Sequence, residues 1–198
     1  MQKIKKLLKP GKGYESYRWF FTSNDVLVVG GKNDEQNELA LDSFLKPNYI
    51  VMHTSAPGSP FCIIQSNNPS KIDIEETAIF CACFSQQWKL GKGLIDIDMF
   101  KGNQIYKKAR MKMGTFGIKG GVKTIKVKPE FVLVLQKGKL RAVPKTTKEE
   151  KLAEIKQGSL NKEEAVKKIS KIIKDKYHFP ISKDEIMGAI PSDKLSVK

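Results

Sequence analysis

Two aspartates that stand two residues apart are the side chains of this sequence best placed for acid–base chemistry. Asp96 and Asp98 lie in a stretch of alternating apolar and polar residues, so a strand there places both carboxylates on one face. Such a pair can bind Mg²⁺ or act as an acid and a base. The same pair can instead form a solvated strand face that neutralises nearby lysines, and the sequence leaves both interpretations open.

His53 is a second candidate for chemistry, because it follows an apolar run and precedes a loop that contains Ser55 and Ser59. A serine–histidine nucleophile needs an orienting acid and an oxyanion motif, and neither is identifiable beside His53. A histidine at a strand end that hydrogen-bonds the loop or touches a ligand is the simpler interpretation. An enzyme that processes nucleic acid or a nucleotide, through His53 and Asp34 or through the aspartate pair, is therefore the alternative function.

Other catalytic and metal sites lack their motifs. No Gly-x4-Gly-Lys-Ser/Thr loop, Cys-x-x-Cys pair or His-Glu-x-x-His motif occurs, so we expect no P-loop nucleotidase, no metal site and no cofactor. The three cysteines stand in apolar surroundings, which predicts buried thiols in a reducing compartment: Cys62, Cys81 and Cys83. No signal peptide and no apolar run of membrane-spanning length is found, so we expect a soluble, cytoplasmic protein.

The strongest chemical signal is the positive charge between residues 101 and 145. Thirteen of these forty-five residues are Lys or Arg and only Glu130 is acidic, which gives a local charge of +12. Residues 13–100 carry six basic and eleven acidic side chains, a charge of −5. Because the charge is concentrated, its field is directional and nucleic acid is the expected partner. A face that serves solubility alone is the other interpretation.

Lysine rather than arginine supplies this charge, since only three of the 36 Lys and Arg residues of the chain are Arg. Lysine is a point charge suited to phosphate, whereas arginine forms the fork that recognises guanine edges. We therefore expect recognition of backbone and shape rather than of base sequence. The residues expected to neutralise phosphates are Lys107, Lys108, Arg110, Lys112, Lys119, Lys123, Lys126 and Lys128.

Two further features lie within the basic block. Tyr106 directly precedes the first cations, so its ring is the best candidate for stacking on a base, with core packing as the alternative. The glycine-rich residues 114–121 can present backbone amides to a phosphate or can simply form hairpin turns.

The elements that position these residues follow an α+β pattern. Apolar runs at residues 17–21 and 26–29 predict a hairpin, and runs at 49–52, 61–65 and 94–99 predict three more strands. Helices are predicted from Asn33 to about residue 45 and over residues 73–88. We therefore predict a mixed or mainly antiparallel sheet flanked by two helices.

The alternation within the basic block predicts strands there as well. Arg110 and Lys112 alternate with methionines, and Lys126 and Lys128 alternate with Ile125 and Val127, so strands would place these cations on one sheet face. Residues 131–135 and 139–143 predict a closing hairpin.

Helical signals dominate after Pro144. Capping-box spacing links Thr147 with Glu150, Asn161 with Glu164, and Ser182 with Glu185, which predicts three helices. The predicted organisation is a nucleic-acid-binding core over residues 1–145 and a small helical C-terminal appendage over residues 146–198. Those helices are also a candidate surface for a ribosomal or other protein partner.

Several short motifs occur in an order that is similar to a known family. They are Tyr17-Arg18-Trp19-Phe20, Gly30-Gly31-Lys32 with Gln36-Asn37-Glu38, His53 with Gly58-Ser59-Pro60, Ser85-Gln86-Gln87-Trp88, and Gly114-Thr115-Phe116-Gly117-Ile118-Lys119-Gly120. Over residues 14–120 the chain resembles the NFACT-R domain, the C-terminal RNA-binding module of the NEMF, fibronectin-binding-protein-A, Caliban and Tae2 family. Because the other parts of the large members are not recognisable, it looks like the stand-alone version known from archaea.

The resemblance implies RNA binding linked to translation or ribosome quality control, because large family members engage tRNA on stalled ribosomal subunits. The candidates that it adds by position are Lys32, Gln36, Asn37, His53 and Lys119. Lys32 precedes a helix whose N-terminus can hold a phosphate, whereas Gln36 and Asn37 can contact the ligand or hold the fold through hydrogen bonds. We predict non-catalytic, structure-selective binding of tRNA or ribosomal RNA, with DNA binding as an alternative.

Overall fold

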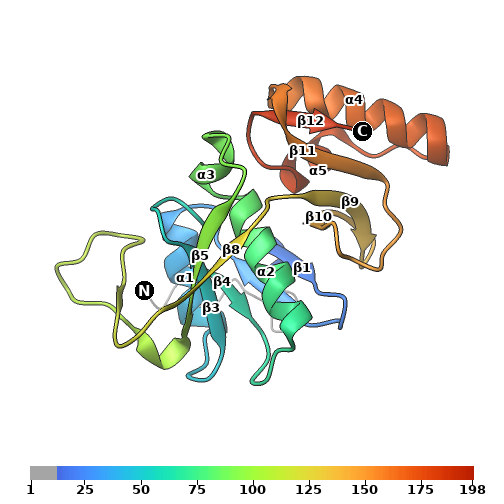
Figure 1. Cartoon of the computed structure of the whole chain (residues 1–198). Coiled ribbons are helices and arrows are strands. Elements are labelled where there is room, and N and C mark those ends of the chain that lie inside the picture. The colour runs from blue at the N-terminus through green and yellow to red at the C-terminus, as the bar shows by residue number, and fades with distance from the viewer. Residues whose placement is uncertain (1–12) are drawn as a thin grey trace.

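Two antiparallel β-sheets with helices packed against them organise residues 13–198, the part of the chain that the computed structural model describes (Figure 1). The larger sheet has six strands in the order β1 (Arg18–Phe21), β2 (Leu27–Gly30), β4 (Cys62–Ile64), β3 (Ile50–Thr54), β5 (Ile95–Lys101) and β8 (Lys123–Val127). A short 3₁₀ helix, η2 (Gly13–Ser16), precedes β1. The predicted α+β class, the first hairpin and the next three strands are confirmed.

Helices cover both faces of this sheet, as the alternation of its strands requires. On one face Val51 packs in a cluster with Leu41 of α1 (Asp34–Phe44), which Asn33 caps. On the other face Met52 packs with Ala78 of α2 (Lys71–Cys83). The helix predicted through residue 88 is interrupted, because Ser85 caps a separate short helix, α3 (Gln86–Lys89). The three cysteines are free and buried, as predicted.

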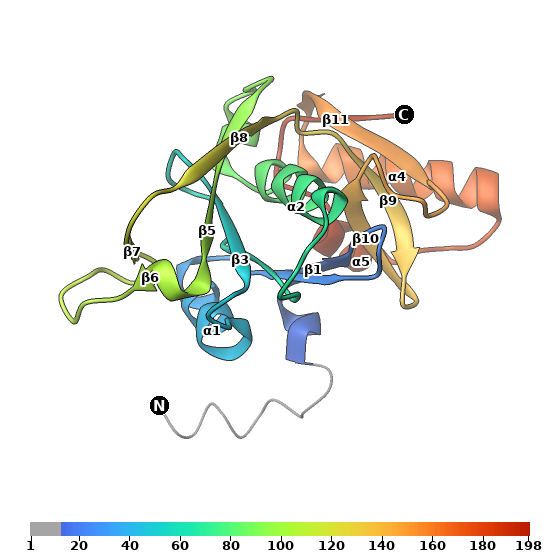
Figure 2. The same cartoon turned by 60° about the horizontal axis from the view of Figure 1, so that its bottom comes forward.

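The second sheet has four strands in the order β10 (Lys139–Pro144), β9 (Phe131–Gln136), β11 (Ala153–Leu160) and β12 (Leu195–Val197). Helices α4 (Lys162–Tyr177) and α5 (Lys183–Ala189) pack against it, while α2 lies between the two sheets (Figures 1 and 2). Gln136 joins the sheets directly: its Oε1 accepts from Phe21 N at 2.8 Å and its Nε2 donates to Phe21 O at 2.8 Å. One continuous apolar cluster therefore spans both sheets and the C-terminal helices.

The prediction of a strand through Arg110 and Lys112 is wrong. Between β5 and β8 the described chain has a 3₁₀ turn, η3 (Gly102–Gln104), followed by two short strands, β6 (Ile105–Tyr106) and β7 (Gly117–Ile118). Between them the backbone bonds close local turns, from Met111 N to Lys108 O and from Thr115 N to Lys112 O. Alternation of cations with methionines does not form a strand here, since no neighbouring strand pairs with this segment in the described chain.

The prediction of a helix starting at Thr147 is also wrong. Thr147 N bonds Pro144 O in a turn, and β11 follows because Ala153 and Ile155 bury their side chains and pair with β9. The other two helices begin at their predicted caps, Asn161 and Ser182. The C-terminal part thus contains two strands as well as helices.

The division into residues 1–145 and 146–198 stays a prediction about separable units. Residues 1–12, the start of the first unit, lie outside the described residues. The β9–β10 hairpin precedes the proposed boundary and pairs with β11 beyond it. Within residues 13–198, no helix combines the length and the apolar composition that crossing a membrane requires.

Candidate nucleic-acid interface

Five of the predicted phosphate-binding cations lie together on one projecting segment. Residues 105–119, named here the basic arm, comprise β6, a long turn region and β7, and extend beside α1 away from the body of the protein (Figures 1 and 2). All five residues are exposed, although the side chain of the first is partly covered by its contact with Glu38: Lys107, Lys108, Arg110, Lys112 and Lys119. A projecting turn segment therefore concentrates the charge, rather than the flat sheet face that the alternation predicts.

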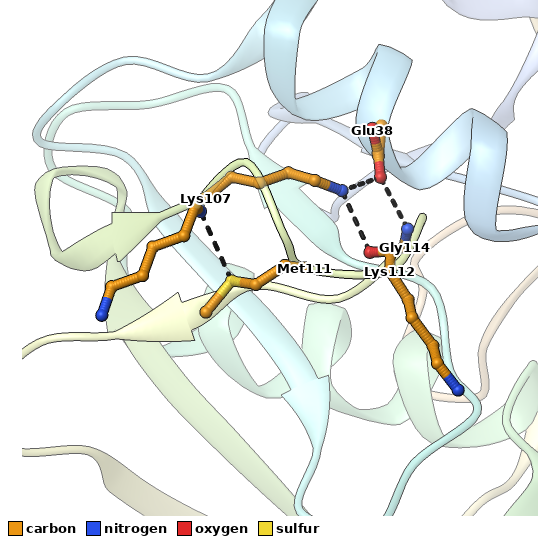
Figure 3. Close-up of polar contacts among 6 residues, drawn as sticks. Glu38, Lys107, Met111, Lys112 and Gly114 are labelled. Carbon is orange, nitrogen blue, oxygen red and sulfur yellow. Dashed lines mark hydrogen bonds and ion pairs between the residues drawn. The ribbon is translucent and has the colours of Figure 1, made fainter.

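Glu38 of α1 anchors the arm to the body (Figure 3). Its Oε1 accepts hydrogen bonds from Lys107 Nζ and, at 2.7 Å, from Gly114 N. Lys107 Nζ also donates to Lys112 O at 3.1 Å, so one ammonium closes the turn and binds it to the helix. The hydrogen bond from Lys107, followed by that from Gly114, lowers the pKa of Glu38. This anchor has no signal in the sequence, because residues 38 and 107 are 69 positions apart.

The glycines of the arm allow its close packing. Gly114 has a φ of 75°, and a Cβ there would lie 2.5 Å from the Cβ of Asp34. At Gly117 a Cβ would lie 2.2 Å from the ring of Tyr106. Gly114, Thr115 and Lys119 already donate their backbone N–H groups within the protein. These observations favour a turn role for the glycines over a cradle of free amides.

Tyr106 combines an aromatic ring with adjacent cations. Its ring rests on Gly117, while Lys108 Nζ and Lys119 Nζ lie 5.7 and 5.4 Å from the ring centroid. The ring is half-buried, so it presents a limited surface for a base. Among the other aromatic residues of the basic block, Phe100 and Phe131 are buried in the core and Phe116 packs edge-on against Phe61.

The remaining predicted cations lie on or next to β8, away from the arm's turn. Lys126 pairs with Asp96 in register and lies 3.6 Å from its carboxylate, whereas Lys123 projects from the opposite face of the strand. Lys128 follows the strand and forms an ion pair with Glu130 at 2.9 Å. The pattern predicted that Lys126 and Lys128 share a strand face, but β8 ends at Val127.

The aspartate pair lies on one strand face, as predicted, and is satisfied by polar neighbours. Asp98 accepts from Ser55 Oγ at 2.6 Å and from Thr124 Oγ1 at 2.8 Å, while Asp96 faces Lys126. In the described residues 13–198, no three His, Cys, Asp or Glu side chains are grouped so that they could hold a metal ion. The surroundings are those of a solvated strand face.

His53 lies in a cavity of about 480 Å³ that the arm covers. Its ring is tilted against Phe61 with centroids 4.5 Å apart, and its Nδ1 lies 2.7 Å from Thr54 O. Burial lowers the pKa of His53, an effect that the Thr54 carbonyl and then Asp98 partly offset. A neutral ring donates from Nδ1 to Thr54 O and leaves Nε2 as a hydrogen-bond acceptor. Residues 113–116 of the arm line the same cavity.

The three candidates around α1 have different surroundings. Lys32 is exposed and donates from Nζ to Ser16 O at 2.7 Å. Gln36 accepts from Lys32 N at 3.1 Å, which holds the turn before the helix. Asn37 is buried, donates to Ser59 O at 3.4 Å and accepts from Phe61 N at 3.1 Å. The contacts of Gln36 and Asn37 are the fold-holding hydrogen bonds that the sequence left as one of two interpretations.

Two relatives share sequence with the chain. It is 31% identical to the archaeal Rqc2 homolog aRqcH of Methanocaldococcus jannaschii, in an alignment that covers 96% of this chain and 30% of the relative. It is 28% identical to the human ribosome quality control complex subunit NEMF over 44% of this chain and 9% of that protein. The chain thus spans less than a third of the length of either relative.

A solved structure supports the fold, and a family model supports the assignment. The C-terminal part of the fibronectin/fibrinogen-binding protein from Streptococcus suis matches 57% of this chain and 45% of its own, with a TM-score of 0.52 and 22% identity. The model of the NFACT protein RNA binding domain matches residues 16–120, which include η3, β6, β7 and the whole arm. The chain therefore belongs to the NFACT RNA-binding domain family.

Proposed function

We propose that this protein binds structured RNA, either tRNA or ribosomal RNA, through the basic arm and without chemical change, as part of ribosome quality control. The observation that carries the proposal is the arm, which projects four cations without ion pairs in the described residues 13–198: Lys108, Arg110, Lys112 and Lys119. Lys107 differs, because Glu38 neutralises it and it serves as the anchor.

The geometry of the arm favours backbone phosphates over base edges. Its cations are mainly lysines on a turn, and the half-buried Tyr106 leaves little room for an intercalated base. The anchor at Glu38 holds the segment in one conformation before RNA arrives, which lowers the entropy that binding must overcome. A fixed set of cations suits a folded RNA better than a flexible single strand.

The relatives supply the biological setting of the proposal. NEMF is a subunit of the ribosome quality control complex, and the archaeal relative is an Rqc2 homolog. We infer a role on RNA in the cytoplasm, next to or on the ribosome, with the exposed face of α4 as the surface for any protein partner. Duplex DNA is the competing ligand, because phosphate attraction alone does not exclude it.

The test is fluorescence anisotropy with labelled tRNA, single-stranded RNA and duplex DNA across a series of salt concentrations. The arm variant is Lys108→Glu/Arg110→Glu/Lys112→Glu/Lys119→Glu. Its matched control reverses four exposed lysines of the C-terminal part: Lys151→Glu/Lys167→Glu/Lys168→Glu/Lys171→Glu. We expect the arm variant to lose tRNA binding and the control to retain it. Equal loss in both variants would refute the arm, and equal affinity for DNA would refute the RNA preference.

One observation favours a second function, a nuclease or nucleotide-processing enzyme. His53 and Asp34 line the same cavity, and the arm would hold a substrate beside them. Incubation of labelled RNA with the protein and Mg²⁺, followed by analysis of product length, tests this alternative. A product that the His53→Gln variant does not form would establish it, whereas unchanged RNA supports binding without chemistry.

A further inference from the structure

A groove next to the cavity of His53 gathers four cations from four separate parts of the chain. It has a volume of about 290 Å³, and the segments that supply its cations are β1, the turn before α1, α3 and the first residue of α4. The cations are Arg18, Lys32, Lys89 and Lys162. Asp34 is the acidic residue among the described residues that line it. Cations therefore outnumber acidic residues four to one among the described residues that line the groove.

Arg18 is the one arginine of this set and is half-buried. Its guanidinium carbon lies 4.2 Å from the centroid of the Phe84 ring, and the side chain has no hydrogen bond or ion pair within residues 13–198. Burial lowers the pKa of Arg18 to about 10, so the group remains charged at neutral pH. A half-buried guanidinium that donates to no protein group keeps its hydrogen-bond donors available to an external acceptor. Its planar fork fits the two oxygens of a phosphate.

The other cations repel Arg18 and one another. Burial is the main cause of the lowered pKa of Lys162, and the charge of Arg18 is the next cause. The same two causes, in the same order, lower the pKa of Lys32. Asp193 offsets part of the effect on Lys162, while Lys89 adds to it. Like charges held this close are relieved when an anion enters between them.

The groove adjoins the surface that the arm covers. The groove and the cavity of His53 share four lining residues, which form the wall between them: Asp34, Asn37, Gly58 and Ser59. A polymer that lies along the arm can therefore continue over this wall into the groove. A strand of linked phosphates can contact the arm and the groove together, whereas a free monovalent anion contacts the groove alone.

We propose that this groove binds a backbone phosphate of the RNA, with Arg18 as the fork at its base and Lys89 and Lys162 at its rim. The proposal rests on RNA binding by this protein. It adds a second contact surface, of which the sequence indicated only Lys32. It also gives the C-terminal part of the chain a place in the site, since Lys162 begins α4 and Ser192 lies in the lining.

The experiment compares the rim variant Lys89→Gln/Lys162→Gln with the control Lys167→Gln/Lys168→Gln, which removes the same charge from the exposed face of α4. The probe is labelled tRNA, measured by anisotropy across a salt series. Each phosphate contact contributes about 0.7 to the salt slope for a single strand, so loss of this one contact should flatten the slope by about 0.7 and weaken binding about fivefold at 0.1 M salt. A rim variant that binds tRNA as the control does would overturn the proposal.

A second measurement follows Arg18 itself and identifies the source of the phosphate. The Nε–H signal of Arg18 in the wild-type protein should shift on addition of tRNA, and the same shift should be absent with chloride at equal ionic strength. A shift with inorganic phosphate but none with tRNA would overturn the assignment to RNA.

The arm variant separates the two proposals. If the arm variant loses tRNA binding while the rim variant keeps it, the groove is wrong and the arm stands. If only the rim variant loses binding, the arm is wrong as the main contact and the groove stands.

Discussion

Glu38 shows how a single acidic side chain can organise a basic surface. It neutralises Lys107 and accepts from Gly114 N, so it joins both ends of the turn region to α1 (Figure 3). A carboxylate in an otherwise basic interface would ordinarily weaken binding to RNA. Here the carboxylate holds the turn that carries the four arm cations for which residues 13–198 provide no ion pair.

The Glu38 anchor should depend on acidity. The pKa of this carboxylate is lowered in the folded protein, first by the hydrogen bond from Lys107. Its contribution is therefore complete above the ordinary glutamate pKa of about 4.3 and is lost as the pH falls through the lower folded value. We expect the NMR signal of the Gly114 amide to move with a midpoint below that ordinary value. The Glu38→Gln variant should lack this transition, and a wild-type midpoint at or above the ordinary value would contradict the anchor.

The half-buried ring of His53 should make stability depend on pH at higher pH values than Glu38 does. Burial lowers the pKa of His53, so below about pH 6.5 the unfolded chain takes up the proton before the folded protein does. The free energy of unfolding should therefore fall as the pH drops through this range. Urea unfolding at several pH values checks this, because His53→Gln should reduce the dependence of the free energy of unfolding on pH. If the free energy of unfolding depends on pH equally in the wild type and in His53→Gln, the lowered pKa of His53 is wrong.

The arm is the element on which the proposed function depends, and Gly114 is the position where its backbone tolerates least change. Alanine there must adopt a φ of 75° and place a Cβ 2.5 Å from Asp34. We expect Gly114→Ala to destabilise the folded arm by about 1–3 kcal/mol and to reduce affinity for tRNA. Gly121→Ala is the control, because a Cβ at that position would have no other atom within 4 Å. Amide exchange over residues 105–119 would reveal the effect, and equal protection in both variants would refute it.

Regular elements could be predicted from the sequence, whereas the arm could not. The caps at Asn33, Asn161 and Ser182 and the apolar strands act over a few residues, so local pattern was sufficient to predict them. Arg110 and Lys112 follow the period of a strand, but that period predicts a strand only when a partner strand is available. Their true conformation depends on Glu38 and Asp34, which are distant in sequence.

Local pattern fails for the same reason at Thr147 and at the groove. Thr147 and Glu150 have the spacing of a capping box, yet pairing of Ala153 and Ile155 with β9 directs the chain into a strand. Arg18, Lys89 and Lys162 are each isolated cations in the sequence, and only the fold brings them together. Candidate sites that lie within one segment of the chain could thus be predicted, whereas sites built from several segments could not.

The two sheets share one core, so the whole molecule should behave as a single cooperative unit. Ile155, Ile169 and Leu195 are fully buried in the cluster that also contains Trp88 and Phe131. Truncation after Lys145 removes β11, β12 and both C-terminal helices and exposes the apolar faces of β9 and α2. We expect the truncated chain to lose its cooperative thermal transition, measured by circular dichroism. A truncated protein that melts like the full chain would show that residues 1–145 form an independent unit.

A milder change tests the same coupling without deletion. Ile169→Ala on α4 should cost about 2–5 kcal/mol, because the side chain is fully buried. Lys168→Ala, at the neighbouring exposed position, should change the free energy of unfolding little. Denaturant unfolding, followed by a signal from the core near Trp88, should show a lower free energy of unfolding for Ile169→Ala. If this signal shows no decrease, α4 unfolds separately from the core.

The measurement that tests the central claim most directly is the salt slope of tRNA binding for the wild type, the arm variant and its C-terminal control. Four phosphate contacts contribute a slope of about 3 in the logarithm of affinity against the logarithm of salt concentration. We predict that the arm variant loses this contribution and that the control, with the same change of charge, keeps most of it. If both variants have the same slope, net charge and not the arm governs the interaction, and the proposed interface is wrong.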